Sequence, residues 1–243
     1  MEVLNDILGY KNRKIYQDTD CFSFSLDSIM LANFVSLRIR DKDIVDLGCG
    51  NGIIPLIISL RTDKKIIGVE LQKKLVDLAV KSVKYNKLED RIEIINDDIK
   101  KYASFNNNKF DVVVCNPPYF KVNKEKNYFN LSKEKLIARH ELELTLSDLL
   151  LSVKKLLRSD GNFAMVHRTD RLIEIIEEFK KNNIEPKRIQ FVHEYINKNS
   201  TLVLIEGQFN GKPGLKIENP FILYNEDGSK TKEYEKIIVE VSV

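Results

Sequence analysis

Short strand-like runs of apolar residues alternate along the chain with longer segments in which the apolar positions have helical spacing. The strand-like runs cover residues 43–47, 65–70, 92–95, 110–115, 161–167, 187–192 and 201–208. The helical spacing predicts helices over residues 51–61, 72–86, 147–157 and 171–183. This order of strands and helices is typical of an α/β protein with a mostly parallel sheet, and we expect the last core strand to be antiparallel.

Two flanking stretches fall outside this alternation. Residues 1–42 contain the apolar segment 29–35 and predict a helical extension before the first strand. Residues 211–243 hold two turn signals around short apolar runs and predict a C-terminal β extension. No change in composition marks a linker, so we expect a single domain over residues 1–243 with its core at 43–210.

The first core strand leads into the glycine-rich turn Gly48-Cys49-Gly50-Asn51-Gly52, and a helix follows. Alternate glycines between a strand and a helix let the backbone approach a ligand closely. Asp46 precedes this turn, and Glu70 ends the next strand, where an acid can accept hydrogen bonds from ribose hydroxyls. The third strand ends in Asn96-Asp97-Asp98. Together these residues predict a site for a nucleotide-like cofactor.

The fourth strand, residues 110–115, ends in Asn116-Pro117-Pro118-Tyr119. Two prolines fix φ and remove two backbone donors, so the segment can neither continue a ladder nor start an ordinary helix. It therefore places a carboxamide, a backbone carbonyl and an aromatic ring at the edge where open α/β sheets bind ligands. Such an acceptor-rich clamp suits a planar –NH2 group, as in adenine, cytosine or a glutamine side chain.

The composition is that of an ordinary globular protein, with 43% hydrophobic and 31% charged residues. No apolar run approaches the roughly 18 residues that span a bilayer, and the N-terminus does not have the pattern of a secretory signal. The three cysteines have no paired spacing, which argues against a disulfide framework or a metal site. We expect a cytoplasmic protein that acts without a membrane or a metal, as a monomer.

The net charge of +3 permits nucleic-acid binding without requiring it. The local clustering of charge is more informative, because basic and aromatic side chains alternate in the segment after the proline pair. Phosphates pair with such cations and unpaired bases stack on the rings, so this segment predicts contact with single-stranded nucleic acid. Intervening glutamates leave a merely solvated loop as the alternative. The candidate RNA-binding residues are Phe120, Lys121, Lys124, Lys126, Arg139 and His140.

The glycine turn with its leading acid resembles motif I of S-adenosylmethionine (SAM)-dependent methyltransferases. With the Asn-Pro-Pro-Tyr segment, the chain resembles the Rossmann-like N6-adenine methyltransferases over nearly its full length. Residues 22–32, 138–141 and 166–168 make it most similar to bacterial enzymes that methylate adenine 37 in the anticodon loop of a valine tRNA. The resemblance implies a Rossmann-like fold, SAM as cofactor and tRNA as partner.

The resemblance also implies a role for each site residue. Asp46, Gly48 and Gly50 would contact the methionine part of SAM, and Glu70 would bind its ribose. Asp98, with Asp97 as the alternative, would bind the adenine amine of SAM. The segment around Asp27 would also hold the cofactor. The expected catalytic residues are Asn116, Pro117 and Tyr119.

Asn116 Oδ1 and the Pro117 carbonyl would accept the two N–H groups of the target amine, while Tyr119 stacks on the base. Three alternatives remain open. One is N5-methylation of a protein glutamine, for which the stretch before the first core strand leaves little room for a substrate domain. Another is N6-methylation of DNA adenine, and the third is a binding module without catalysis.

Overall fold

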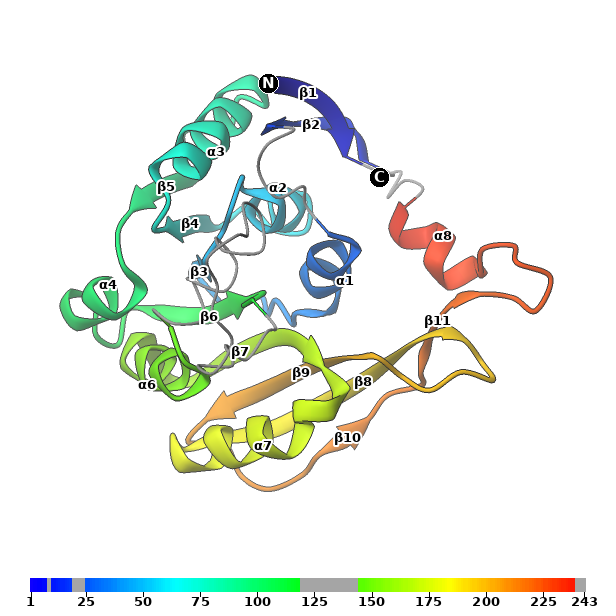
Figure 1. The fold of residues 1–243 in the computed structure, drawn as a ribbon. Coiled ribbons are helices and arrows are strands. Elements are labelled where there is room, and N and C mark those ends of the chain that lie inside the picture. Colours follow the sequence, from blue (N-terminus) through cyan, green and yellow to red (C-terminus); the bar gives the residue numbers. More distant parts are fainter. Residues whose placement is uncertain (8–9, 19–24, 119–143, 239–243) are drawn as a thin grey trace, which may run out of the picture.

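In the computed structural model, which describes residues 1–7, 10–18, 25–118 and 144–238, nine strands form one central sheet (Figure 1). They are β3 (Asp43–Leu47), β4 (Lys65–Glu70), β5 (Ile92–Asn96), β6 (Phe110–Cys115), β7 (Leu157–Arg168), β8 (Ile184–Tyr195), β9 (Leu202–Phe209), β10 (Lys216–Ile217) and β11 (Phe221–Tyr224). Their order is β10-β8-β9-β7-β6-β3-β4-β5, and β11 also pairs with β8.

Within these described strands, β9 alone runs against its neighbours, being antiparallel to both β7 and β8. The pairs from β5 through β4, β3 and β6 to β7 are all parallel. The expected architecture, a mostly parallel sheet whose last core strand is antiparallel, is confirmed. Because the parallel strands share one direction, their carboxyl ends meet along one edge of the sheet.

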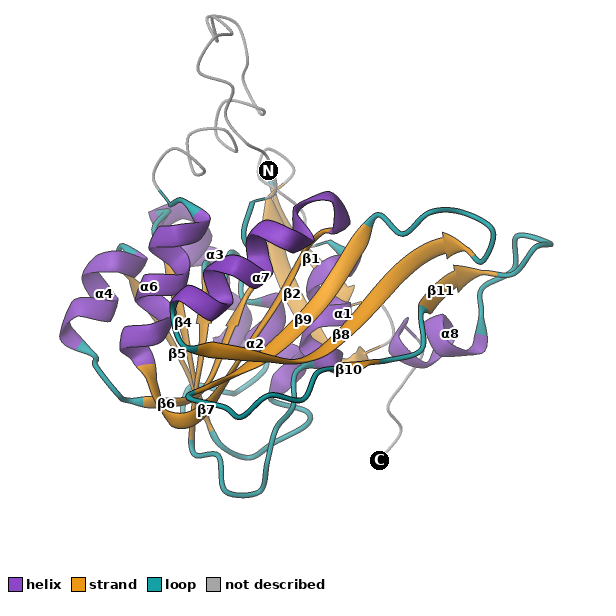
Figure 2. Ribbon diagram, turned by 90° about the horizontal axis from the view of Figure 1, so that it is seen from below, coloured by secondary structure: helices purple, strands orange, loops and turns teal. Residues whose placement is uncertain are grey.

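Helices cover both faces of the sheet. On one face lie α1 (Leu26–Phe34), α2 (Ile53–Ile58), α3 (Lys73–Tyr85) and α8 (Lys232–Ile238), which share one apolar core with the sheet. The other face carries α4 (Ile99–Phe105), α6 (Leu146–Leu156) and α7 (Leu172–Lys181), over a second core. Figure 2 shows these last three helices side by side. None of the described helices is long and apolar enough to cross a membrane.

The N-terminal extension differs from the expectation of a helical segment. Its first part is a hairpin of β1 (Glu2–Ile7) and β2 (Tyr10–Asp18), and within the part of the extension that the structure describes only α1 is helical. The short helices α4 and α8 were also not expected. The expected helices at 51–61, 72–86, 147–157 and 171–183 are present as α2, α3, α6 and α7, with somewhat different ends.

The hairpin packs on α3 and reaches the glycine turn. The Tyr16 backbone N–H donates to Ser82 Oγ over 2.9 Å, and the Lys14 N–H donates to Asn86 Oδ1 over 3.0 Å. Asn51, inside the glycine turn, donates from Nδ2 to the Tyr16 carbonyl over 3.3 Å. The first strands of the chain are thus joined to the turn proposed to hold the cofactor.

The C-terminal β extension is present as two short strands and one helix. Both strands add in parallel to the outer side of β8, with Lys216 level with Arg188 and Phe221 level with Val192. The chain then turns and α8 packs near β11 and α1. One edge of the sheet is therefore formed by β10 and β11 and the other by β5.

Candidate active site

The carboxyl ends of β3, β4, β5 and β6 carry the residues that the sequence singled out. Asp46 and Leu47 end β3, Glu70 ends β4, and Asn116 follows β6 directly. Leu47 is level with Val69 on one side and with Cys115 on the other. The parallel register therefore brings the glycine turn, Glu70 and Asn116 to one edge of the sheet.

The glycine turn is bent into a shape that favours glycine. Gly48, Gly50 and Gly52 have φ values of +72°, +57° and +90°, which side chains with a Cβ rarely adopt. A Cβ built on Gly48 or Gly50 would meet no atom within 4 Å. The N–H groups of Gly48 and Cys49 both donate to the Val69 carbonyl, over 2.8 and 3.1 Å. The turn is therefore folded back onto β4, with open space beside two of its glycines.

Glu70 connects the end of β4 to this turn. Its Oε2 accepts a hydrogen bond from the Gly50 N–H over 3.0 Å, and Oε1 accepts one from the Gln72 N–H over 2.8 Å. The residue is buried. Because each carboxylate oxygen has a second lone pair, these bonds orient the carboxylate and leave it able to accept from a ribose hydroxyl.

Asp46 is a fully buried acid, and neither of its carboxylate oxygens has a hydrogen-bond partner among the described residues. Burial, and then the negative charge of Glu70, raise its pKa well above the usual range. Burial also raises the pKa of the thiols of Cys49 and Cys115, and the negative charges of Asp46 and Glu70 raise it further. An isolated buried carboxylate is costly unless a cation or donor approaches it. The ammonium and sulfonium groups of SAM therefore fit this part of the site.

The end of β5 offers two acids with different surroundings. Asp98 is the N-cap of α4, where Oδ1 accepts from the N–H groups of Lys100 and Lys101 over 2.8 and 3.0 Å. Asp97 forms an ion pair with Lys101 at 3.2 Å. The Asp97 carboxylate is also engaged, because its Oδ1 accepts from the Asp98 N–H over 3.0 Å. Asp98 therefore remains the expected ligand of the adenine amine of SAM, with Asp97 as the alternative.

Asn116 lies at the end of β6, on the side of the glycine turn away from Glu70. Its Nδ2 donates to Ser28 Oγ, in the first turn of α1, over 2.8 Å. Asp27, the expected cofactor residue, precedes Ser28 in the same turn. Asn116, Pro117 and Pro118 are each partly buried. The acceptor side of the site is thus formed by β6 and α1 together.

Part of the expected site lies outside the described residues. These residues are Tyr119, Phe120, Lys121, Lys124, Lys126, Arg139 and His140. Their roles in base stacking and RNA binding remain predictions from the sequence.

Beside the proline pair, the structure adds polar residues that were not among the expected site residues. A small cavity of about 10 Å³ is lined by Pro117, Pro118, Leu144, Thr145, Leu146, Leu149, His167 and Arg171. Burial, followed by the nearby positive charge of Arg171, lowers the pKa of His167 to about 4. Its Nδ1 accepts from the Arg168 N–H over 2.8 Å. A neutral imidazole therefore forms one wall of a cavity that Pro117 and Pro118 also line. Its position in the stretch 166–168, which carries the resemblance, was the signal available in the sequence.

Nothing in the geometry of the described residues suggests a metal centre, because no group of three or more His, Cys, Asp or Glu side chains converges there.

Comparison with known proteins places this geometry in a family. The family model for the methyltransferase small domain matches residues 24–191. The tRNA1(Val) (adenine(37)-N6)-methyltransferase of Bacteroides thetaiotaomicron is 30% identical over 171 residues, covering 68% of each chain. The enzyme of the same name from Aliivibrio salmonicida is 26% identical over 205 residues, covering 84% of each chain.

Solved structures show the same fold at lower identity. A "predicted O-methyltransferase" from Agrobacterium tumefaciens covers 87% of this chain and 95% of its own, with a TM-score of 0.69 and 19% identity. The Pyrococcus horikoshii TYW2 structure in complex with MeSAdo covers 86% of this chain and 72% of its own, with a TM-score of 0.60 and 16% identity. From its sequence match and its fold, the chain belongs to the methyltransferase small domain family and is a SAM-dependent methyltransferase.

Proposed function

We propose that this enzyme methylates N6 of an unpaired adenine in tRNA, adenine 37 in the anticodon loop of tRNA1(Val). The observation that carries the proposal is Asn116-Pro117 at the end of β6, beside a glycine turn and a buried Asp46 that has no hydrogen-bond partner among the described residues and is suited to SAM. The homologues that bear the name of this activity support it, with matches over about two thirds or more of the chain.

The cofactor side of the site would hold SAM through Asp46, the glycine turn, Glu70 and Asp98, with Asp97 as the alternative to Asp98. SAM supplies a methyl group on a positively charged sulfonium, which is already a strong electrophile. Asp46 would place its negative charge near the cationic end, and Glu70 would bind the ribose hydroxyls. These contacts fix where the methyl group is presented, and they need no movement of the sheet because they lie on the ends of β3, β4 and β5.

On the acceptor side, the residues must activate the adenine amine, which is a poor nucleophile. The lone pair of the adenine amine is delocalised into the ring. In the proposed function Asn116 Oδ1 and the Pro117 carbonyl accept its two N–H groups and draw the hydrogens out of the ring plane. These bonds strengthen as positive charge develops on the nitrogen, so they favour the transition state over the ground state.

The RNA would be held by the segment after Pro118, which lies outside the described residues. In the sequence this segment alternates cations with aromatic rings, among them Tyr119 and Phe120. An anticodon loop offers unpaired bases that can stack on such rings, which is the usual way in which RNA sequence is recognised. A tRNA substrate also implies action in the cytoplasm. We further propose that residues 1–243 act as one domain and as a monomer.

Incubation with labelled SAM and total tRNA, followed by nucleoside and position analysis, tests the proposed function. We expect N6-methyladenosine at one anticodon-loop position, and none with Asn116→Ala. Parallel reactions with DNA and with ribosomal and release-factor proteins serve as the comparison. Methylated DNA, or methylated glutamine in a protein, together with unreacted tRNA would overturn the proposal.

A further inference from the structure

The carboxamide of Asn116 is held by a residue from a distant part of the chain. Ser28 Oγ accepts its Nδ2–H over 2.8 Å, across 88 positions of sequence. Ser28 is buried, with 6% of its surface exposed, and belongs to the first turn of α1. We propose that Ser28 is a positioning residue, whose hydroxyl fixes the Asn116 carboxamide for methyl transfer. This inference rests on the function proposed above.

The chemistry of the amide explains why its orientation matters. A carboxamide has an acceptor end, Oδ1, and a donor end, Nδ2, and only the acceptor end can bind the N–H of a target amine. In the observed orientation Nδ2 points to Ser28, and Oδ1 lies at the opposite end of the planar group. An amide rotated by 180° would instead bring two donors together at the acceptor nitrogen. A serine hydroxyl can donate as well as accept, so Ser28 fixes the position and the plane of the carboxamide. With Nδ2 bound to Ser28, Oδ1 is the end left for the target amine.

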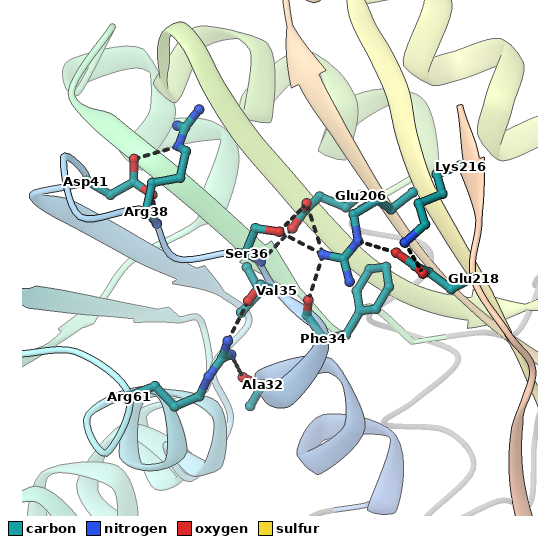
Figure 3. A network of polar contacts seen from close by, with 11 residues as sticks. Ala32, Phe34, Val35, Ser36, Arg38, Asp41, Arg61, Glu206, Lys216 and Glu218 are labelled. Atoms are coloured by element: carbon teal, nitrogen blue, oxygen red, sulfur yellow. Dashed lines mark hydrogen bonds and ion pairs between the residues drawn. The ribbon is translucent and has the colours of Figure 1, made fainter. Parts of the chain in front are cut away.

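The helix that carries Ser28 is itself fixed at its far end. Arg61 donates to the Ala32 carbonyl and, over 2.9 Å, to the Val35 carbonyl, as Figure 3 shows. Arg188 donates to the Phe34 carbonyl over 3.2 Å. Arginines at a helix C-terminus satisfy its last carbonyls and complement the helix dipole. α1 is therefore bound both to the end of α2 and to β8.

A second group of contacts ties the segment directly after α1 to strands β9 and β8. Glu206 on β9, almost fully buried, accepts from the N–H and the hydroxyl of Ser36, each over 2.7 Å (Figure 3). Arg188 also binds Glu218 over 3.1 Å, next to β10. Ile29 and Leu31 are fully buried in the core under the helix. The helix that carries Ser28 is therefore fixed at its end and along its buried face. A residue that orients another side chain needs such a fixed position.

Steady-state kinetics of Ser28→Ala test the inference first. We expect kcat to fall about tenfold, because one hydrogen bond that holds the amide is lost, while the Kd for SAM and the KM for tRNA stay within about twofold. Ser28→Thr, which keeps the hydroxyl, should restore most of the rate. A Ser28→Ala enzyme that binds SAM tenfold more weakly but keeps its kcat would make Ser28 a cofactor ligand instead.

The double variant gives the sharper test. If Ser28 acts only through Asn116, adding Ser28→Ala to Asn116→Ala should slow single-turnover methylation no further. Ser152→Ala is the matched control, since it removes a buried hydroxyl that donates to the carbonyl of Asp148 within α6. Any loss of methylation rate caused by Ser152→Ala should multiply with the loss caused by Asn116→Ala, or Ser152→Ala should have no effect on the rate. A double variant whose losses multiply would overturn the positioning role of Ser28.

A readout without RNA separates this inference from the proposed function. The side-chain amide signals of Asn116 can be identified by NMR as the pair missing from Asn116→Ala. In Ser28→Ala we expect them to shift and to exchange faster with water. Unchanged signals would overturn the positioning role whatever the substrate is. Shifted signals in a protein that methylates no tRNA would overturn the proposed function but not the Ser28–Asn116 contact.

Discussion

The two halves of the candidate site are assembled over very different distances along the chain. In the cofactor half, Glu70 binds the N–H of Gly50 across 20 positions, and the residues involved end neighbouring strands. In the acceptor half, Asn116 is bound by Ser28 across 88 positions, and α1 in turn is held by Arg188 and Glu206 from β8 and β9. The first half is formed by a local supersecondary unit and the second by the tertiary fold.

This difference indicates how each half should respond to change. The cofactor half relies on backbone shape, since its glycines have positive φ and its acid binds backbone N–H groups. The acceptor half relies on side-chain orientation at the end of a buried helix. Substitutions in the first half should alter SAM binding, and those in the second should alter turnover at unchanged SAM binding.

The largest effect should come from Asn116→Ala. Loss of the acceptor that strengthens in the transition state should lower kcat by about 10²–10³-fold, while the Kd for SAM stays within a few-fold. Single-turnover methylation and calorimetry with SAM measure the two quantities. Asn225→Ala, in an exposed turn, is the control and should leave both unchanged. A variant that keeps most of its kcat would remove Asn116 from the mechanism.

Gly50→Val should impair SAM binding by the cofactor half of the site. A branched side chain would enter the open space beside the turn and strain a backbone at φ +57°, so we expect SAM affinity to fall about 100-fold. Gly228→Val is the matched control, because Gly228 also has positive φ and open space around its Cβ position but lies in a distant turn. Equal SAM affinity in the two variants would show that motif I does not contact the cofactor.

Asp46→Asn should change the stability of the protein and its affinity for SAM in opposite directions. An acid whose folded pKa is raised stabilises the fold fully only below its unfolded pKa of about 4, and that contribution is lost as pH rises through the folded pKa. The neutral variant lacks this loss, so without SAM it should be more stable than the wild type at pH 8 and little different at acidic pH.

Urea unfolding without SAM at several pH values measures this difference, and calorimetry should show weaker SAM binding by the same variant. If the stability difference between Asp46→Asn and the wild type does not change with pH, the pKa of Asp46 is not raised in the folded protein.

The smallest effect concerns the segment after the proline pair, which is outside the described residues. Reversing the charge of Lys124 and Lys126 should weaken tRNA binding and lower the slope of log K against log salt, by about one unit or less for each phosphate contact that is lost. SAM binding should not change. Reversal of Lys232 and Lys236, both exposed on α8, is the control. A slope equal to that of the control would exclude these two lysines as phosphate contacts.

The cofactor half could be predicted from the sequence because its structure is encoded locally. The glycine turn, its leading Asp46 and the acid Glu70 all follow apolar strands, and each was placed correctly at a strand end. The choice between Asp97 and Asp98 was harder, since both acids follow β5. Only the structure shows that Asp98 caps α4, a helix of seven residues too short to give a clear periodic signal.

The acceptor half and the extensions could not be predicted in the same way. Asn116 was identified from its motif. Its partner Ser28 lies in the stretch 22–32 that carries the resemblance, but no sequence pattern shows the contact, because it depends on how α1 packs against β6. The β1–β2 hairpin was missed because polar and charged residues interrupt its strands. It is held instead by bonds to α3, such as that from the Tyr16 N–H to Ser82, which no local pattern records.

The two short strands of the C-terminal extension have a consequence for self-association. β8 is a twelve-residue strand, and without β10 and β11 its outer backbone groups would form an open sheet edge. An exposed edge of that length is a template on which a second chain can add its own strand. By pairing at Lys216–Ile217 and Phe221–Tyr224, the extension covers parts of this edge, and it replaces one twelve-residue strand at the edge of the sheet with strands of two and four residues.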